Sequence, residues 1–197
     1  MTAVGPLRER IQGIVIGASA GGVEALSVLL PSLRQGMRAP VFIAMHLPRD
    51  RPSLLTEIFG ARCAVPVREA EDKEPALPAT VYFAPPDYHL LIEDGPRIAL
   101  SVDDVVHFSR PSIDVLFQTA ADVFGESLMG IILSGANDDG AEGLKTIHER
   151  GGVTVVQEPN GAYESRMINA ALAACQPHFV LPLDAMASLL GTLEVPA

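Results

Sequence analysis

Three side chains with complementary chemistry each follow an apolar run of the sequence. Ser19 stands in a Gly-Ala-Ser-Ala-Gly-Gly turn, His46 precedes Leu-Pro, and Asp139 lies in the loop Ser-Gly-Ala-Asn-Asp-Asp-Gly-Ala. A hydroxyl, an imidazole and a carboxylate can form an acyl-transfer triad, in which the imidazole removes the serine proton and the carboxylate fixes the tautomer of the imidazole. These residue types therefore indicate hydrolysis of an ester or amide through a serine nucleophile, provided that the fold brings them together.

The order of the apolar runs predicts how the fold brings these three side chains together. Apolar runs alternate with helix-like segments, which is typical of an α/β layered domain. The runs are too continuous for strands with one solvated face, so they favour a mainly parallel sheet with helices on both sides. Because the carboxyl ends of parallel strands share one edge, we expect the three side chains to meet there. The expected strands are 14–18, 41–45, 81–84, 129–133 and 153–156, and the expected helices lie near 21–34, 52–60, 112–125, 140–150 and 163–174.

Two details refine this plan. Between about 81 and 101, short apolar segments separated by Pro-Pro-Asp and Glu-Asp-Gly-Pro predict a hairpin or meander inserted in the parallel arrangement. Ser112 and Gly125 flank a segment with helical periodicity. Serine is favoured before the first turn of a helix and glycine after the last, so we expect the helix to begin and end at these residues.

The turn around Ser19 also admits a second interpretation. The first N–H groups of a helix attract a phosphate as readily as an oxyanion, so a nucleotide-binding domain has to be considered. Against it, the segment reads Gly-x-Ser-x-Gly-Gly and not Gly-x-Gly-x-x-Gly, and no Walker lysine follows. For acyl chemistry, the candidate oxyanion donors are the backbone N–H groups of Ala20 and Gly21 and one from the turn at Ala136.

Composition bounds the class of protein. A chain of 197 residues with 48% hydrophobic content fits one globular domain. The formal net charge of −10, without any basic cluster longer than two residues, disfavours nucleic acid as a partner. No apolar stretch is long enough for a membrane span and no signal-peptide core opens the chain, so we expect a cytoplasmic protein without direct membrane insertion. Cys63 and Cys175 lack metal-ligand spacing, and we expect neither metal nor cofactor.

Six segments of the chain carry motifs that occur together. The segments are Ile16-Gly-Ala-Ser-Ala-Gly-Gly22, Met45-His-Leu-Pro48, Val67-Arg-Glu-Ala-Glu-Asp72, Val81-Tyr-Phe-Ala-Pro85 with His89, Arg110-Pro-Ser-Ile-Asp-Val-Leu-Phe117 and Ile132-Leu-Ser-Gly-Ala-Asn-Asp-Asp-Gly-Ala141. In this order and at this spacing, from about residue 12 onward, they resemble the catalytic domain of the chemotaxis protein-glutamate methylesterases, the CheB family.

The resemblance implies a three-layer α/β/α sandwich with a mainly parallel, doubly wound sheet and a few antiparallel strands. It also implies hydrolysis of glutamate γ-methyl esters on receptor proteins with release of methanol, and deamidation of glutamine at the same serine. Ser19 matches the nucleophile of the family, His46 its histidine, and Asp139, rather than Asp138, its aspartate.

Two further positions are candidates for contact with the substrate, each beside a simpler alternative. His89 either lines the cleft or is a structural histidine. Arg110 either contacts an acidic receptor segment or forms a local salt bridge.

The chain also departs from the family. Members usually carry an N-terminal phosphorylation-receiver domain, whereas about ten residues precede the first expected strand here. We therefore expect an extension at 1–10, a stand-alone catalytic domain at 11–195, and regulation by a separate protein. The Met-Gly pair before the aspartate of the family is Ala136-Asn137, and its later Gly-Met-Pro element is Arg166-Met-Ile. These changes motivate an alternative function, that of a catalytically weak adaptor that binds a receptor or another signalling partner.

Overall fold

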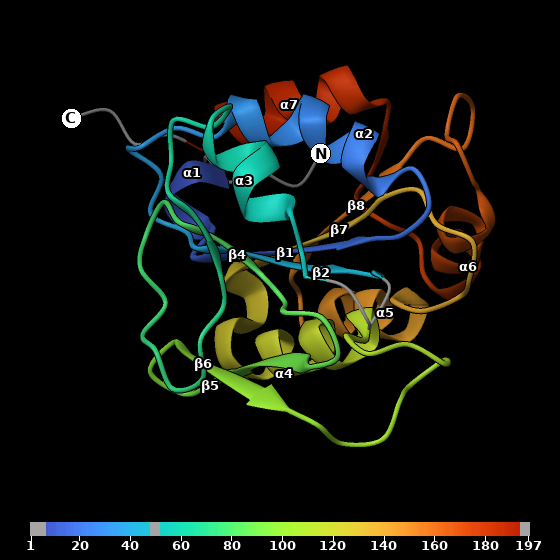
Figure 1. The fold of residues 1–197 in the computed structure, drawn as a ribbon. Helices are drawn as coiled ribbons and strands as arrows, with labels where there is room; N and C mark the ends of the chain where they lie inside the picture. Colours follow the sequence, from blue (N-terminus) through green and yellow to red (C-terminus); the bar gives the residue numbers. More distant parts are fainter. Residues whose placement is uncertain (1–6, 48–51, 194–197) are drawn as a thin grey trace.

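The computed structural model describes residues 7–47 and 52–193, which form one seven-stranded parallel sheet and a separate two-stranded one (Figure 1). The order of the large sheet is β3-β4-β2-β1-β7-β8-β9. The chain begins in the middle at β1, adds strands on one side and then crosses to the other, so the direction of winding reverses beside β1. The strands are β1 (Gly13–Ala18), β2 (Val41–Met45), β3 (Val67–Glu69), β4 (Val81–Phe83), β7 (Leu128–Ile132), β8 (Val153–Gln157) and β9 (Phe179–Leu181).

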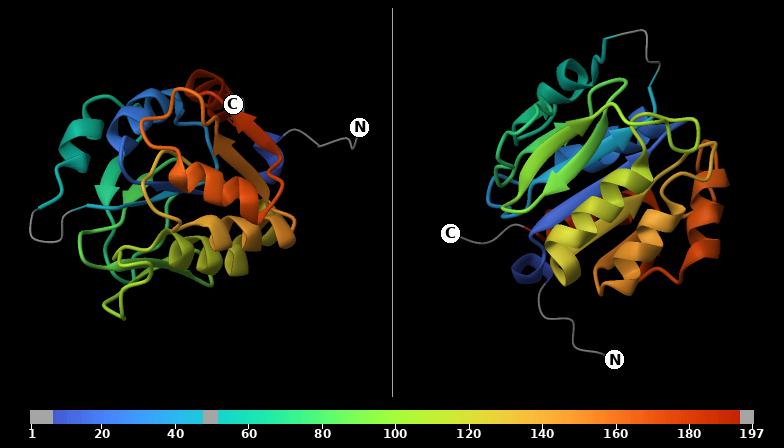
Figure 2. Two further views of the ribbon diagram at one scale, coloured as in Figure 1. Left: turned by 90° about the vertical axis from the view of Figure 1, so that its right-hand side faces the viewer. Right: turned by 90° about the horizontal axis from the view of Figure 1, so that it is seen from below.

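Helices cover both faces of the sheet, which gives the three layers seen in Figures 1 and 2. One apolar core lies between the sheet and α2, α3 and α7, and a second lies between the sheet and α4, α5 and α6. Successive side chains of a strand point to opposite faces, so Ile14 and Ile16 enter the first core and Val15 enters the second. The helices are α1 (Leu7–Arg10), α2 (Gly22–Leu29), α3 (Leu55–Gly60), α4 (Ile113–Phe124), α5 (Ala141–Glu149), α6 (Arg166–Ala174) and α7 (Leu183–Gly191), with short 3-10 helices at Leu30–Ser32 and Gly125–Ser127.

These layers confirm the expected α/β/α sandwich. Within the two described stretches, none of the helices is both long and apolar enough to cross a membrane.

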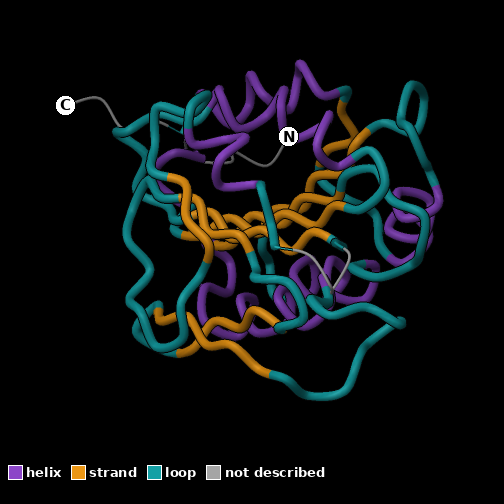
Figure 3. The backbone as a smooth tube through the Cα atoms, in the orientation of Figure 1, coloured by secondary structure: helices purple, strands orange, loops and turns teal. Residues whose placement is uncertain are grey.

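The segment between 81 and 101 contains a hairpin, not a three-stranded meander. β5 (His89–Glu93) and β6 (Arg97–Ser101) pair antiparallel as the separate two-stranded sheet, while β4 joins the large parallel sheet (Figure 3). Leu90 and Ile98 of the hairpin are buried in the second core with residues of α4. The hairpin therefore lies on the same face of the sheet as α4.

Helix α4 begins and ends where the sequence predicts. The Oγ of Ser112 accepts a hydrogen bond from the N–H of Val115 at 3.4 Å, which is the expected capping contact. Gly125 follows the last turn with a φ of +52°. The start of α4 matters for function because it faces the site described below.

Several elements lie outside the sequence predictions, namely α1, β3, β9 and α7. β3 and β9 have three residues each and are partly exposed, so neither forms a continuous apolar run. In α7 only Met186 and Leu190 are buried, which leaves a sparse apolar pattern. The expected helix 21–34 ends early, because α2 stops at Leu29. The chain continues as a 3-10 turn that contains Pro31, which has no N–H to donate.

Candidate active site

Three neighbouring strands bring Ser19, His46 and Asp139 to one edge of the sheet. β1 lies between β2 and β7; Ser19 directly follows β1, His46 directly follows β2, and Asp139 lies between β7 and α5. Backbone hydrogen bonds tie these ends together, because His46 N–H donates to the carbonyl of Ala18 at 3.2 Å and Ser19 N–H donates to that of Ser134 at 3.0 Å. The three segments therefore meet at the carboxyl edge of the sheet, where open α/β folds place their sites.

The carboxylate of Asp139 is fully buried and accepts hydrogen bonds from four donors. Its Oδ2 accepts from His46 Nε2 at 2.8 Å and from the N–H of Ile113 at 2.7 Å. Its Oδ1 accepts from Ser112 Oγ at 2.9 Å and from the N–H of Asp114 at 3.0 Å. Three of these donors belong to the start of α4, where N–H groups lack partners inside the helix and the helix dipole favours a negative charge. The start of α4 thus forms the binding site for this carboxylate.

Gly140 allows this close approach between the Asp139 loop and α4. Its φ is +97°, a conformation that residues with a Cβ rarely adopt. A Cβ at this position would also lie 2.6 Å from Ile113 Cγ2 and 2.7 Å from Ile132 Cδ1. A glycine directly after Asp139 is therefore required for the carboxylate to reach the helix end.

The surroundings of Asp139 keep it ionised. Burial alone would raise its pKa, but the hydrogen bonds from His46 and from the N–H groups of Asp114 and Ile113 outweigh burial and lower the pKa below its ordinary value of 3.8. An ionised Asp139 can only accept a hydrogen bond, so Nε2 must donate it. The neutral ring of His46 therefore carries its proton on Nε2.

The lowered pKa of Asp139 predicts a pH dependence of stability. A depressed carboxyl pKa stabilises the fold at pH values above the ordinary pKa, and this contribution is lost as pH falls through the lowered value. We expect Asp139→Asn to reduce the free energy of unfolding most at neutral pH, with the difference from the unchanged protein shrinking below about pH 4. Urea unfolding of both proteins between pH 3 and 8 measures this difference in free energy. A difference that stays the same in acid would contradict the prediction.

His46 has hydrogen-bond partners at both ring nitrogens. Nε2 donates to Asp139, and Nδ1 lies 3.2 Å from the side-chain Nδ2 of Asn137, which donates to it. The side chain is 13% exposed, so it borders the solvent-accessible edge of the site. Among the described residues no hydrogen bond joins Ser19 Oγ to His46, and the ring nitrogen available to Ser19 is the one that Asn137 contacts.

Ser19 is half-buried beside two turns that offer backbone N–H groups. Within the described ranges, no hydrogen bond between residues uses the N–H of Ala20, Gly21 or Ala136. Gly135 brings the second turn close, because a Cβ there would lie 3.0 Å from the Cβ of Ser19 and 2.6 Å from a methionine methyl group. Donors on two sides of one hydroxyl are what an oxyanion site needs.

His89 does not present a ring nitrogen to the substrate. It is 2% exposed, its Nδ1 accepts from the N–H of Ser112 at 3.1 Å, and its Nε2 donates to the carbonyl of Asp104 at 3.0 Å. Both ring nitrogens are therefore used inside the protein, which corresponds to the structural alternative. His89 orients Ser112, which in turn contacts Asp139.

Arg110 likewise forms the local salt bridge rather than presenting a free guanidinium. Its Nε and Nη2 donate to Asp87 Oδ1 at 3.0 and 2.9 Å, and its Nη1 donates to the carbonyls of Val102 and Asp103. With these partners Arg110 holds the loop between β6 and α4 in place. A substrate contact would require it to leave them.

Two polar residues beside the site have roles that the sequence did not suggest. The Oγ of Ser134 donates to the carbonyl of Ala20 at 2.7 Å and accepts from the N–H of Glu164 at 2.9 Å, so it joins the Ser19 turn to the loop before α6. Asp114 accepts from the N–H of Gly143 at 2.6 Å, and its burial raises its pKa. The available signals were a serine directly after the apolar run 129–133 and an aspartate among the apolar residues of α4.

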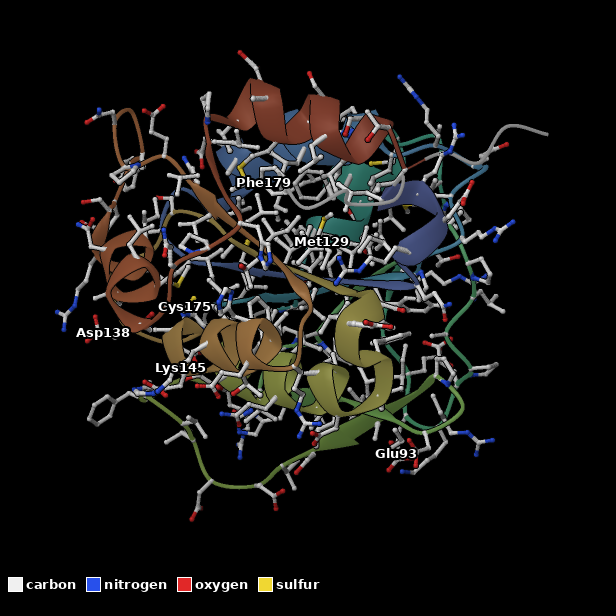
Figure 4. The ribbon with its side chains drawn as sticks, turned by 180° about the vertical axis from the view of Figure 1, so that it is seen from behind. Glu93, Met129, Asp138, Lys145, Cys175 and Phe179 are labelled. Atoms are coloured by element: carbon white, nitrogen blue, oxygen red, sulfur yellow. The ribbon has the colours of Figure 1, made fainter. Side chains whose placement is uncertain are left out.

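Asp138, next to the candidate triad, is on the surface. Figure 4 labels it at the edge of the molecule beside α6, where Arg166 donates from Nε and Nη2 to its two oxygens at 2.9 and 3.0 Å. This ion pair lowers the pKa of Asp138. Asp138 and Asp139 are adjacent in sequence, but only Asp139 contacts His46.

The remaining candidates for reactive or metal-binding groups have other uses. His107, Asp114 and Asp139 place ligand atoms within 4.8 Å of one another, but both oxygens of Asp139 already accept two hydrogen bonds each. Burial raises the pKa of Cys63 and Cys175, so neither thiol has the low pKa of a nucleophilic cysteine.

A half-buried hydroxyl, an imidazole and a buried carboxylate at the carboxyl edge of a parallel sheet are typical of α/β enzymes that hydrolyse esters through a serine. Residues 14–190 match the family model described as CheB methylesterase. The chain therefore belongs to the CheB methylesterase family.

Individual relatives agree with this assignment. A protein of Leptospira interrogans named putative protein-glutamate methylesterase/protein-glutamine glutaminase is 43% identical over 183 residues, which cover 93% of this chain and 95% of that protein. A Rhizobium johnstonii protein-glutamate methylesterase/protein-glutamine glutaminase is 38% identical, and the match covers 88% of this chain but 48% of the relative. The crystal structure of the Thermotoga maritima CheB methylesterase catalytic domain superposes with a TM-score of 0.88 at 26% identity, covering 93% of this chain and 98% of that one.

Proposed function

We propose that this protein hydrolyses the γ-methyl esters of glutamate side chains on a methyl-accepting receptor protein and releases methanol. The observation that carries the proposal is the 2.8 Å contact between His46 and the buried Asp139, directly beside Ser19 at the sheet edge. The names of the relatives, protein-glutamate methylesterase/protein-glutamine glutaminase, support this substrate class.

In the proposed reaction the Ser19 oxygen attacks the ester carbonyl while Nδ1 of His46 takes the serine proton. Asp139 stabilises the imidazolium through Nε2–H, and the N–H groups of Ala20, Gly21 and Ala136 are the candidate donors to the oxyanion. Collapse breaks the bond to the methoxy group, which leaves as methanol with the proton from Nδ1. Water then attacks the acyl-enzyme with His46 as base, which frees the glutamate carboxylate and restores Ser19.

The same steps act on a glutamine side chain, with ammonia in place of methanol. Amide nitrogen is a poor leaving group until it is protonated, so this reaction depends more on proton transfer from His46. We propose glutamine deamidation as the second activity of the site, in line with the glutaminase part of the relatives' names.

The cellular setting forms part of the proposal. A receptor with methylated glutamates is the expected substrate, the cytoplasm is the proposed location, and a separate protein is the proposed regulator. The proposed domain limits are 11–195 for the catalytic domain and 1–10 for the extension; residues 1–6 and 194–195 lie outside the described residues.

The test follows methanol released from methyl-labelled receptor fragments. The unchanged protein is expected to release labelled methanol with multiple turnovers, and His46→Gln, which has no ring base, is expected to fall by several orders of magnitude. Ammonia from a glutamine-containing fragment is followed in parallel. Binding of the fragments without turnover would contradict the proposal and support the adaptor function, which the altered Ala136-Asn137 and Arg166-Met-Ile segments motivate.

A further inference from the structure

We propose that Asn137 restrains the catalytic base in the free enzyme: its side-chain amide binds the lone pair of His46 Nδ1 that must take the proton of Ser19. The inference rests on the proposed serine chemistry and adds a means of controlling the same site. It starts from the 3.2 Å contact between Asn137 Nδ2 and His46 Nδ1.

The orientation of the amide is fixed by its other end. The N–H of Asp139 donates to Asn137 Oδ1 at 3.3 Å, two residues along the chain, which is the hydrogen bond of an Asx turn. With the oxygen held there, the NH₂ group of Asn137 is the end that faces the imidazole. An NH₂ group can only donate, and Nδ1 can accept because the proton of the neutral ring is on Nε2 beside Asp139.

The loop that carries Asn137 is held on both sides. Asp139 is bound to the start of α4. Asp138 is bound by the two-pronged contact with Arg166 at the start of α6. Asn137 is not among the non-glycine residues with a positive φ, so asparagine replaces the glycine of the family motif without backbone strain. Of the residues that depart from the family motifs, Arg166 thus holds this loop through Asp138, and Asn137 contacts the ring nitrogen of His46.

This contact competes directly with catalysis. A general base must form a hydrogen bond with the proton that it removes, and Nδ1 has one lone pair in the ring plane. While Asn137 donates to it, Ser19 cannot. The amide must turn away before Ser19 is activated, so breaking one neutral hydrogen bond becomes part of the barrier to acylation.

The test measures the rate at which a fluorophosphonate probe modifies Ser19, because this reaction needs the serine and its base but no receptor. We expect Asn137→Ala to raise the maximal rate constant of labelling about fivefold, the factor that corresponds to one neutral hydrogen bond. The probe concentration for half-maximal rate should not change. The matched control is Asn160→Ala, at an exposed asparagine in the loop after β8, which should label like the unchanged protein.

A spectroscopic measurement separates this role from a structural one. In protein with ¹⁵N-labelled histidine rings, removal of the amide donor should move the Nδ1 resonance of His46 toward that of an unbonded ring nitrogen, with the other four histidines as references. Asn137→Asp should act in the opposite direction to alanine, because a carboxylate favours a proton on Nδ1, and labelling should fall below that of the unchanged protein. If the alanine variant does not fold, Asn137→Gly repeats the test with the residue of the family motif.

An unchanged or lower labelling rate in folded Asn137→Ala, or an unchanged Nδ1 resonance, would overturn the inference. Methanol release distinguishes this failure from that of the proposed function. Faster labelling in Asn137→Ala without methanol from any receptor ester would leave the restraint intact and reject the substrate. Methanol release at equal rates from Asn137→Ala and from the unchanged protein, with equal labelling of Ser19, would support the proposed function and overturn the restraint by Asn137.

Discussion

Asp139→Asn is expected to lower kcat for methyl ester hydrolysis by about 10⁴-fold, the loss that follows when a triad loses its carboxylate and keeps its shape. The structure gives the reason. Both oxygens of Asp139 accept hydrogen bonds, from His46 Nε2 and Ile113 at one and from Ser112 and Asp114 at the other. An amide replaces one acceptor by a donor, so at least one N–H at the start of α4 loses its partner and the tautomer of His46 is no longer fixed.

The adjacent Asp138 supplies the matched control for this substitution. Asp138→Asn makes the same chemical change one residue earlier, at an exposed carboxylate paired with Arg166 and not with His46. Its kcat should stay within a factor of about ten of the unchanged protein, because one surface ion pair contributes little. Steady-state methanol release compares the two variants. Equal losses in Asp138→Asn and Asp139→Asn would refute the assignment of Asp139 to the triad.

Ser19→Ala is expected to remove about 10⁶-fold in kcat, as loss of the nucleophile does in comparable enzymes, while leaving the melting temperature unchanged. The hydroxyl of Ser19 has no hydrogen-bond partner among the described residues, so its removal costs the fold little. The activity is lost because the variant has no hydroxyl directly after β1 to attack the ester.

Ser134→Ala is the contrasting variant. Its hydroxyl links Ala20 to Glu164, so its removal takes a hydrogen-bond partner from the carbonyl of Ala20 and from the N–H of Glu164, which are partly buried, and should destabilise the protein by roughly 1 kcal/mol. Differential scanning calorimetry and methanol release together separate the two serines. Residual methanol release by Ser19→Ala close to that of the unchanged protein would exclude Ser19 as the nucleophile.

Much of the site could be predicted because it follows from the chain direction of buried strands. Ser19 and His46 directly follow their strands and Asp139 lies in the loop after a third strand, and a parallel sheet brings such segments to one edge. The capping of α4 by Ser112 could also be predicted from the sequence, because it depends on residues close in sequence. What could be predicted was the position of the backbone segments that carry the three triad residues and the two ends of α4.

The hydrogen-bond partners of individual side chains could not be predicted in the same way. His89 and Arg110 stand in segments that match the family, yet their polar atoms bind Asp104, Ser112 and Asp87 and not an open cleft. The sequence marks Asn137 only as a departure from the glycine of the family motif, and its contact with His46 depends on an Asx turn. Which partner a polar side chain binds depends on differences of a few tenths of an ångström in its distances to other residues, and these are set by the folded structure.

The central claim, that a glutamate γ-methyl ester acylates Ser19, is tested most directly by acid-quenching the reaction with a methylated receptor peptide and locating the adduct by mass spectrometry. The account predicts that the tryptic peptide 11–34 gains the mass of the substrate peptide minus methanol, and that fragmentation places this mass on Ser19. An adduct on another residue, or methanol release without any covalent intermediate in the pre-steady state, would contradict it.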